Sequence, residues 1–322
     1  MRIAPAMATA MLALLIAPSR GSAQFPPDSF TNLKVLPRDI NRDSLVALMG
    51  RFTRALGVRC TYCHVGEENR PLSTYNFAAD DKPTKRTARV MLQMVHHINE
   101  EHLAEVEKRV QPPVTVECAT CHRGTTTPRM LQDVLLIAYQ AGGLDSSLKV
   151  YRGLRERYYG RFTYDFSEVP LADVAGRIAA QGNLGDAERL HALNVEMNPA
   201  SVFAKRQHAT LAIGRAFLAD GADSGAAAYA RLKASYGAPV NEGLLNQVGY
   251  ALLGIHQVEA AILAFSFAVK EFPNSSNAYD SLGEAYMTKG DKPRAIENYE
   301  RSLALDPSNT NAQDRLKTLR GR

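Results

Sequence analysis

The sequence predicts an all-α protein made of two parts. All four cysteines of the 322-residue chain fall in two Cys-x-x-Cys-His motifs, at Cys60–His64 and Cys118–His122. Both motifs follow segments whose apolar residues recur with the 3.6-residue period of a helix. From residue 131 onward there is no cysteine, and small and aromatic residues recur every 34 residues instead. We therefore expect an N-terminal domain over 24–130 and a helical repeat domain over 131–322.

Residues 1–23 have the pattern of a secretory signal peptide. Arg2 gives a short basic start, the apolar stretch AMATAMLALLIA follows, and the small residues GSA at 21–23 resemble a cleavage site. An uncleaved N-terminal anchor is the alternative, because Pro18 and Arg20 could also end an anchoring helix. We expect export to the periplasm, with the protein either soluble or held at the outer face of the inner membrane.

The composition is ordinary for a soluble globular protein, with 45% hydrophobic and 22% charged residues. The formal net charge is +5, and it falls to +3 without residues 1–23, which carry two arginines and no acid. An excess this small does not indicate a nucleic-acid partner.

Cys-x-x-Cys-His is the attachment motif of a c-type haem. Two thiols on one helical turn can add to the two vinyl groups of the haem, and the adjoining His then lies beneath the iron. The motifs therefore predict two covalently bound haems. The predicted attachment residues are Cys60, Cys63, Cys118 and Cys121, and the predicted proximal iron ligands are His64 and His122.

Three alternatives use the same cysteines. Export favours disulfides, but here both pairs have the same short spacing and are followed at once by His. A Cys-x-x-Cys redox pair would not repeat with His each time. A four-cysteine zinc site has suitable spacing, but it leaves His64 and His122 unexplained. Haem attachment accounts for all six residues.

The sixth iron ligand distinguishes electron transfer from chemistry on a bound molecule. Before the first motif, one face of a predicted helix carries Leu45, Leu48, Met49, Phe52 and Leu56. Asn41 is its predicted N-cap and Gly57 its predicted stop. Met49 lies eleven residues before Cys60, where its thioether could lie over a haem. The alternative is that Met49 only fills the core, as methionines on such faces usually do.

A second helix is predicted in KPTKRTARVMLQMVHHINEEHL, with Thr84 as its cap. The ligand candidates there, by residue type, are Met91, Met94, His96, His97 and His102. Periodicity places Met91 and Met94 on the inward face and His96 and His97 sideways or outward. All three histidines are predicted to be solvated helix residues. From the residues alone, the ligand of the second haem stays open among these five.

These segments resemble the photosynthetic reaction centre cytochrome c subunit family over about residues 30–130. The resemblance is carried by NLKVLPRDINRDSLVALMGRFTRALGVRCTYCHVG, DDKPTKRTARVMLQMVHHINEEH and VECATCHRG. The family packs its haems in pairs, each with a helix, a turn and the haem motif, and its axial Met lies on the helix before each motif. The resemblance implies Met49 as axial ligand of the first haem and Met91 as that of the second.

The chain departs from the family pattern in three ways. Well-known members carry four haems, whereas this chain has motifs for two. Members are often lipid-anchored, and no cysteine lies near the predicted cleavage site. Pro112-Pro113 interrupts the stretch between Glu100 and Cys118. The resemblance thus covers about half of such a subunit, and a respiratory setting stays open beside a photosynthetic one.

The second part predicts a tetratricopeptide solenoid. The tetratricopeptide positions of the segment from Ser276 are filled by Leu282, Gly283, Tyr286, Ala295, Tyr299 and Pro307. Shifting back 34 residues gives Val248, Gly249, Leu252, Ala261, Phe265 and Pro273. A weaker copy ends at Asn198-Pro199, and 131–158 and 203–236 are predicted to be degenerate helix pairs. The tail from Asn311 to Arg322 is predicted to be a polar capping helix.

These features together predict an exported di-haem cytochrome c that carries single electrons between periplasmic or membrane redox partners and is not an enzyme. His/Met ligation closes both axial positions and raises the potential. The resemblance implies a photosynthetic reaction centre as one such partner, where the subunit re-reduces a photo-oxidised donor. The repeats predict docking of a protein or peptide, with mechanical support of the haem domain as the alternative. A di-haem peroxidase with one open site and a repeat scaffold with structural haems are the other two functions considered.

Overall fold

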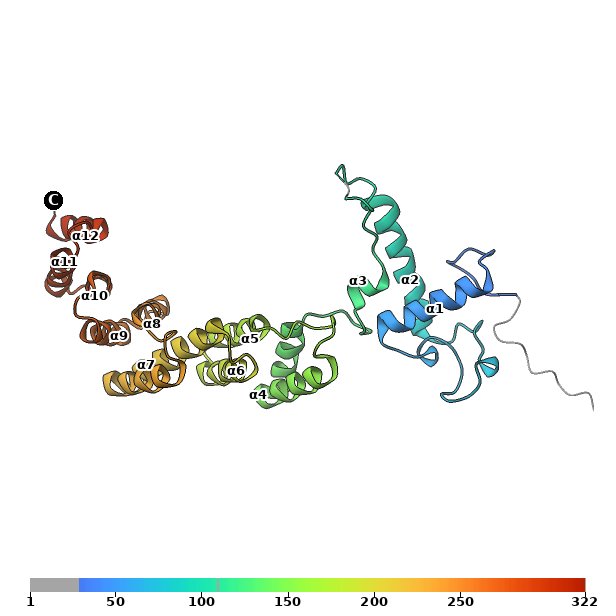
Figure 1. Cartoon of the computed structure of the whole chain (residues 1–322), viewed down its shortest axis with the longest axis horizontal. Helices are drawn as coiled ribbons and strands as arrows, with labels where there is room; N and C mark the ends of the chain where they lie inside the picture. Colours follow the sequence, from blue (N-terminus) through green and yellow to red (C-terminus); the bar gives the residue numbers. More distant parts are fainter. Residues whose placement is uncertain (1–28, 109, 322) are drawn as a thin grey trace, which may run out of the picture. The chain divides into compact units, whose positions relative to one another are not determined.

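The computed structural model describes residues 29–108 and 110–321, so the predicted signal peptide lies outside the described residues. The described chain forms two compact units, one ending at Pro128 and the other beginning at Arg129 (Figure 1). Within these ranges the structure is helical, and its one extended pairing is an isolated bridge between Val65 and Asn76. The predicted all-α class is confirmed. No helix in the described ranges is long and apolar enough to cross a membrane.

Helix α1 spans Arg42–Leu56 and begins and ends where the sequence predicts. The side chain of Asn41 accepts a hydrogen bond from the Ser44 amide at 2.8 Å. Gly57 ends the helix in the left-handed region, at φ 66°. A Cβ on Gly57 would lie 2.2 Å from the carbonyl oxygen of Gly124, so only glycine fits this contact. The Gly124 amide also donates to the Ala55 carbonyl at 2.8 Å, which fastens the end of α1 to the loop after the second motif.

Helix α2 spans Pro83–His97 and continues into a π-helical turn, η3, at Ile98–His102. The predicted cap at Thr84 is wrong. The helix begins at Pro83, a residue favoured at the first helical position, and the Thr84 hydroxyl donates instead to the Tyr62 carbonyl in the first motif. Thr84 therefore connects α2 to the first motif rather than capping the helix.

The other end of α2 is held near the second motif. In η3, the Asn99 side chain donates to the Val116 carbonyl at 2.9 Å and accepts from the Val116 amide at 2.7 Å. Val116 lies two residues before the short helix α3, Cys118–His122. The first motif contains a second short helix, η1, at Cys60–Tyr62, and η2 follows at Leu72–Thr74. Helix α2 with its π-turn thus connects the two motifs.

The second unit is a series of helix pairs. Its helices are α4 (Leu131–Tyr158), α5 (Glu168–Ala180), α6 (Leu184–Met197), α7 (Val202–Tyr236), α8 (Glu242–Gly254), α9 (Val258–Glu271), α10 (Ser276–Lys289), α11 (Lys292–Leu305) and α12 (Thr310–Arg320). The two longest helices are each broken by glycine, α4 at Gly142-Gly143 and α7 at Gly221. Each of them is therefore a helix pair, as predicted for 131–158 and 203–236, and α12 forms the predicted terminal helix.

One glycine–aromatic contact recurs at the same position of successive repeats. A Cβ on Gly249 of α8 would lie 2.3 Å from the ring of Phe265 in α9, and one on Gly283 of α10 would lie 3.1 Å from the ring of Tyr299 in α11. Phe265 and Tyr299 are both fully buried. The missing side chain at each glycine lets the two helices of a pair approach closely enough to bury the aromatic ring.

Two histidines lie between α6 and α7, one buried and one half-buried. His191 of α6 is 6% exposed, and burial lowers its pKa to about 4, with a smaller contribution from the charge of His208. His208 of α7 shares a hydrogen bond of 2.6 Å with the Tyr236 hydroxyl. Burial lowers the pKa of His208 too, opposed by the carboxylate of Glu188 and assisted by Arg231. Both imidazoles are therefore neutral in the folded unit at pH 7.

We expect Gly249→Ala to destabilise the repeat unit by about 1–3 kcal/mol, because the added methyl must displace the Phe265 ring. The matched control is Gly254→Ala in the same helix, where a Cβ would meet nothing within 4 Å. That change should leave stability unchanged or raise it by up to about 1 kcal/mol. Urea unfolding followed by circular dichroism measures both, and equal midpoints for the two variants would contradict the packing described.

We expect the repeat unit to lose stability as the pH falls from about 6.5 towards 4. The pKa of His191 is lower in the folded state than its ordinary value of 6.5, so its stabilising contribution is complete above pH 6.5 and is lost on acidification. Between pH 7 and pH 5 the loss from His191 should be about 2 kcal/mol. His191→Leu should flatten the urea-unfolding profile over this range, whereas the exposed control His256→Gln should not. Parallel profiles for His191→Leu and wild type would refute this assignment.

Candidate haem-binding site

The first motif places its three functional side chains on one turn. The amide of Cys63 donates to the Cys60 carbonyl at 3.2 Å, and that of His64 donates to the same carbonyl at 2.9 Å. Both cysteines are half-buried and neither forms a disulfide. Burial raises the pKa of the Cys63 thiol, opposed by a hydrogen bond from Thr84. Two free thiols and an imidazole leaving a single turn match what a c-type haem requires.

The second motif is a five-residue helix with defined ends. The Thr120 hydroxyl accepts from the Glu117 amide at 3.0 Å, and Arg123 ends the helix in the left-handed region, at φ 46°. Nδ1 of His122 lies 2.9 Å from the Thr125 carbonyl oxygen. A carbonyl can only accept, so Nδ1 carries the proton and Nε2 keeps its lone pair. This tautomer is the one that can bind iron through Nε2.

His64 lies in a more enclosed environment. Its imidazole packs edge-on against the Phe77 ring, with centroids 4.9 Å apart. Burial lowers the pKa of His64, the charge of Lys85 lowers it further, and the Phe77 backbone opposes the shift. A neutral imidazole is the form that coordinates a metal, so the residues of the first motif also fit a haem.

The four cysteines do not form one shared site. In the described ranges, no group of three or more His, Cys, Asp or Glu side chains is placed to hold a metal ion. All four thiols are free. This arrangement gives no support to the four-cysteine zinc and disulfide alternatives, and it leaves two separate Cys-Cys-His units.

The structure distinguishes among the methionine candidates. Met49 is half-buried on α1, the helix that packs against α3. Met91 is half-buried in the middle of α2, but Met94 is 45% exposed. The inward position predicted for Met94 is therefore wrong. The half-buried stripe of α2 runs through Met91, Val95 and Ile98 at i, i+4 and i+7, and Met94 lies to one side of it.

The three histidines of this region, His96, His97 and His102, are exposed, as predicted. The structure does not assign a sixth ligand to either haem, so Met49 and Met91 stay predictions.

A charged cluster beside the first motif was not found from the sequence. The Asp80 carboxylate accepts from Lys34 at 2.6 Å and from Asn32 at 3.0 Å, and it forms ion pairs with Arg89 at 2.8 Å and Lys85 at 3.2 Å. These partners, Arg89 foremost, hold the pKa of Asp80 well below its usual range. The run DDKPTKRTAR shows nearby opposite charges, but nothing local indicates Lys34 or Asn32, more than 40 positions away.

Lys85 also orders the loop that covers His64. Its ammonium donates to the carbonyls of Phe77 at 2.9 Å and Ala79 at 2.7 Å. The Lys85 side chain is 11% exposed, and Asp80 supplies its counter-charge. The cluster thus fixes the loop that carries Phe77 against the imidazole of the first motif.

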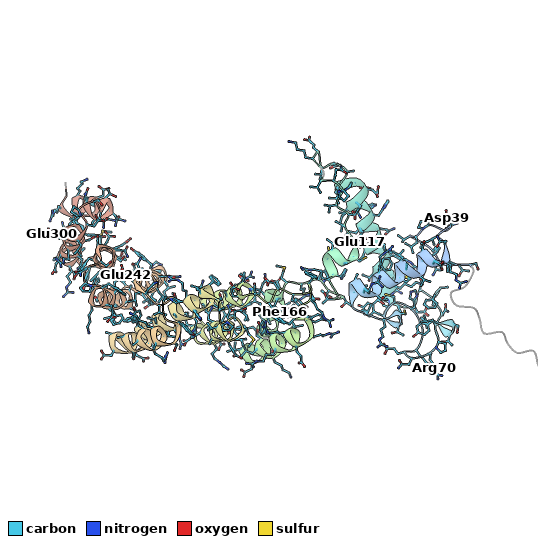
Figure 2. All side chains as sticks on the ribbon, in the orientation of Figure 1. Asp39, Arg70, Glu117, Phe166, Glu242 and Glu300 are labelled. Atoms are coloured by element: carbon cyan, nitrogen blue, oxygen red, sulfur yellow. The ribbon has the colours of Figure 1, made fainter. Side chains whose placement is uncertain are left out.

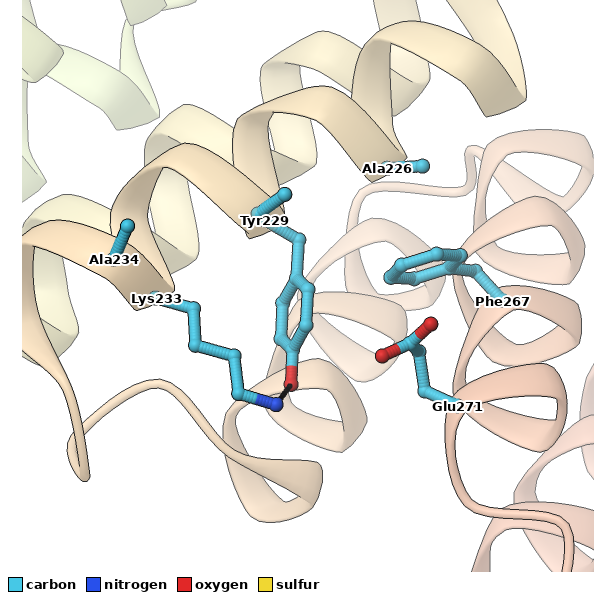
Figure 3. Close-up of a pocket in the computed structure, with 7 residues that line it drawn as sticks. Ala226, Tyr229, Lys233, Ala234, Phe267 and Glu271 are labelled. Carbon is cyan, nitrogen blue, oxygen red and sulfur yellow. Dashed lines mark hydrogen bonds between the residues drawn. The ribbon is translucent and has the colours of Figure 1, made fainter.

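The repeat unit contains a shallow apolar hollow between α7 and α9 (Figure 3). Its alanines, Ala226, Ala230 and Ala234, leave room beside Tyr229 and Phe267. Lys233 and Glu271 complete the lining, and the Lys233 ammonium lies 3.3 Å from the Tyr229 hydroxyl. One cation and one anion beside an apolar surface give no arrangement for catalysis.

Comparison with known families agrees with both parts of the chain. Residues 16–134 match the model of the family described as "Photosynthetic reaction centre cytochrome C subunit". The N-terminal unit is cytochrome c-like. Residues 276–309 match the tetratricopeptide repeat, so the predicted resemblances are confirmed for both parts.

The curated relatives are similar to part of the chain. A photosynthetic reaction center cytochrome c subunit of Roseobacter denitrificans is 36% identical over 110 residues, which are 34% of this chain and 28% of that protein. Cytochrome c-554 of Chloroflexus aurantiacus is 40% identical over 68 residues, 21% of this chain and 14% of that protein. The chain thus spans less than a third of the length of either relative. These cytochromes imply covalently bound c-type haem in this chain.

Among solved structures, the tetratricopeptide protein YrrB aligns with 48% of this chain and 77% of its own, at 14% identity and a TM-score of 0.29.

We expect the chain produced in a host that matures c-type cytochromes to carry two covalent haems. Intact-mass spectrometry should show the mass of the processed chain plus two haems, because each motif offers two free thiols. Replacing Cys60 and Cys63 together by Ala should remove one haem, and so should the same change at Cys118 and Cys121. The control Thr61→Ala, within the first motif, should keep both. A wild-type mass without haem would contradict the assignment.

Proposed function

We propose that this protein is an exported electron carrier whose two Cys-x-x-Cys-His motifs each hold one c-type haem. The observation that carries the proposal is the pair of separate one-turn units, each with two free thiols and one imidazole. The match to the reaction centre cytochrome family over 16–134 supports it. A bound c-type haem supplies reversible one-electron Fe(III)/Fe(II) chemistry.

The residues of the chain hold and orient the cofactor. The four cysteines form the thioether attachments, and His64 and His122 are the proximal ligands. The Thr125 carbonyl accepts a hydrogen bond from Nδ1 of His122 and so orients the imidazole in the tautomer that leaves Nε2 free for the metal. The Phe77 loop, fixed by Lys85, limits the access of water to His64. With little water nearby, replacement of the His64 imidazole by water at the iron would be disfavoured.

Met49 and Met91 are the proposed axial ligands. Both are half-buried on helices of the same unit, and a thioether favours the reduced iron and so raises the potential. With a histidine and a methionine bound to each iron, a haem here would have no open coordination site for a substrate. This arrangement supports electron transfer rather than peroxide chemistry.

The partners follow from the same features. An exported cytochrome would exchange electrons with periplasmic or membrane redox proteins through small, transient contacts. The matched family makes a photosynthetic reaction centre one candidate, and a respiratory complex is another. The tetratricopeptide unit supports docking of a protein or peptide, because such solenoids present extended surfaces for binding.

We expect the reduced wild-type protein to bind no carbon monoxide, because both axial positions are occupied. Met49→Ala and Met91→Ala should each create one binding site, seen in the absorption spectrum, without loss of covalent haem. Met49→His or Met91→His should instead lower the potential of the affected haem. Met94→Ala is the matched control, since it removes a thioether from an exposed position on the same helix as Met91.

Two outcomes would change the proposal. Carbon monoxide binding by wild type together with peroxide turnover would replace the electron carrier with a peroxidase. A new binding site in Met94→Ala, with none in Met91→Ala, would move the ligand assignment to Met94.

A further inference from the structure

An exposed aromatic turn follows α4 in the repeat unit. The Arg161 amide donates to the Tyr158 carbonyl at 3.0 Å, and Gly160 takes the left-handed conformation, at φ 76°, that the tight turn requires. Phe162 is 93% exposed, which is the highest value among the large hydrophobic side chains of the described residues, and Tyr159 is 63% exposed. The turn therefore presents two aromatic rings to solvent.

The base of the turn is anchored in the core. Phe166, labelled in Figure 2, is 8% exposed and packs edge-on against the buried Tyr151 ring, with centroids 5.9 Å apart. The Arg155 guanidinium lies 4.0 Å from the centroid of the Tyr159 ring and restrains that side chain. The tip of the turn, Tyr159 and Phe162, is thus attached to a packed core, so the exposure of its rings is a feature of the fold.

The segment that leads to the tip is strongly basic. Residues 149–162 contain five basic residues and one acidic residue. Four of the basic side chains are exposed, namely Lys149, Arg152, Arg157 and Arg161. Among the ion pairs of the described part of the chain, none joins one of these four to a carboxylate; the Arg157 guanidinium lies 5.2 Å from the centroid of the Tyr158 ring. Their charge is therefore available to an external anion.

We propose that the Tyr159–Phe162 turn and its four exposed bases, the aromatic–basic turn, bind an anionic membrane surface. Aromatic rings favour the level of the lipid headgroups, and arginine or lysine beside them attracts anionic lipid. A specific protein interface of standard size covers about 800 Å² on each partner and takes about 20–30 residues a side. A single exposed aromatic turn that follows a basic helix segment fits a lipid surface better than such an interface.

This inference does not depend on haem or on the proposed electron carriage. The inference concerns where the protein is held: a turn that binds lipid would keep it reversibly at a membrane surface. Each basic residue near an anionic surface strengthens binding roughly fivefold. The bound state should therefore weaken as salt is raised.

The test uses the full-length protein and sedimentation with vesicles of phosphatidylcholine, with or without phosphatidylglycerol. Wild type should bind the anionic vesicles and not the neutral ones. Phe162→Ser should weaken binding by fivefold or more, and Arg152→Gln combined with Arg161→Gln by more than tenfold. The matched controls are Ile255→Ser, an exposed apolar residue elsewhere in the unit, and Lys270→Gln, an exposed base. Both controls should bind like wild type.

A direct probe is available because the chain contains no tryptophan. In Phe162→Trp, emission should shift to the blue when anionic vesicles are added, whereas Ile255→Trp should show no shift. Wild type that binds neutral and anionic vesicles equally, or neither, would overturn the proposal. A different outcome would also overturn the proposal. If wild type binds no vesicles and Phe162→Ser loses binding to a protein partner, the turn is a protein interface.

Discussion

Each Cys-x-x-Cys-His unit must present two thiols and one imidazole from a single backbone turn, and the N-terminal unit is organised around this requirement. The amides of Cys63 and His64 close the first turn on the Cys60 carbonyl, and the second turn is the helix α3 itself. Short turns of this kind have little stability of their own. They must be held by contacts from elsewhere in the chain.

Those contacts come from α1 and α2. The end of α1 is fastened to the loop after the second motif by the close approach of Gly57 to Gly124. Helix α2 contacts the first motif at its start, through Thr84, and reaches Val116 at its end, through Asn99 in the π-turn. π-Turns often mark functional positions in helices. Here the turn places Asn99 where it can hold the segment that leads into the second motif.

The repeat unit uses the same glycine–aromatic contact in two successive helix pairs and departs from it in two places. Gly249 and Gly283 each make room for a buried aromatic ring in the partner helix. Between α6 and α7, the buried His191 and the half-buried His208 are both neutral. After α4, the turn at Tyr159–Phe162 exposes two aromatic rings, and Phe162 is the most exposed large hydrophobic residue of the described chain. These departures give the array a pH dependence and a distinctive surface that the shared repeat pattern does not provide.

The sequence by itself determined the features that depend on neighbouring residues. Asn41 caps α1 and Gly57 ends it because their effects act within one turn, and the 34-residue period fixes which residues fill the repeat positions. Tertiary structure decided the rest. Thr84 binds a carbonyl of the first motif instead of capping its helix, and Asp80 gathers partners from more than 40 positions away. Met94 is exposed because packing covers only a narrow, half-buried stripe of α2. These contacts and exposures depend on which segments pack against each other in the folded chain, and a local sequence pattern does not contain that information.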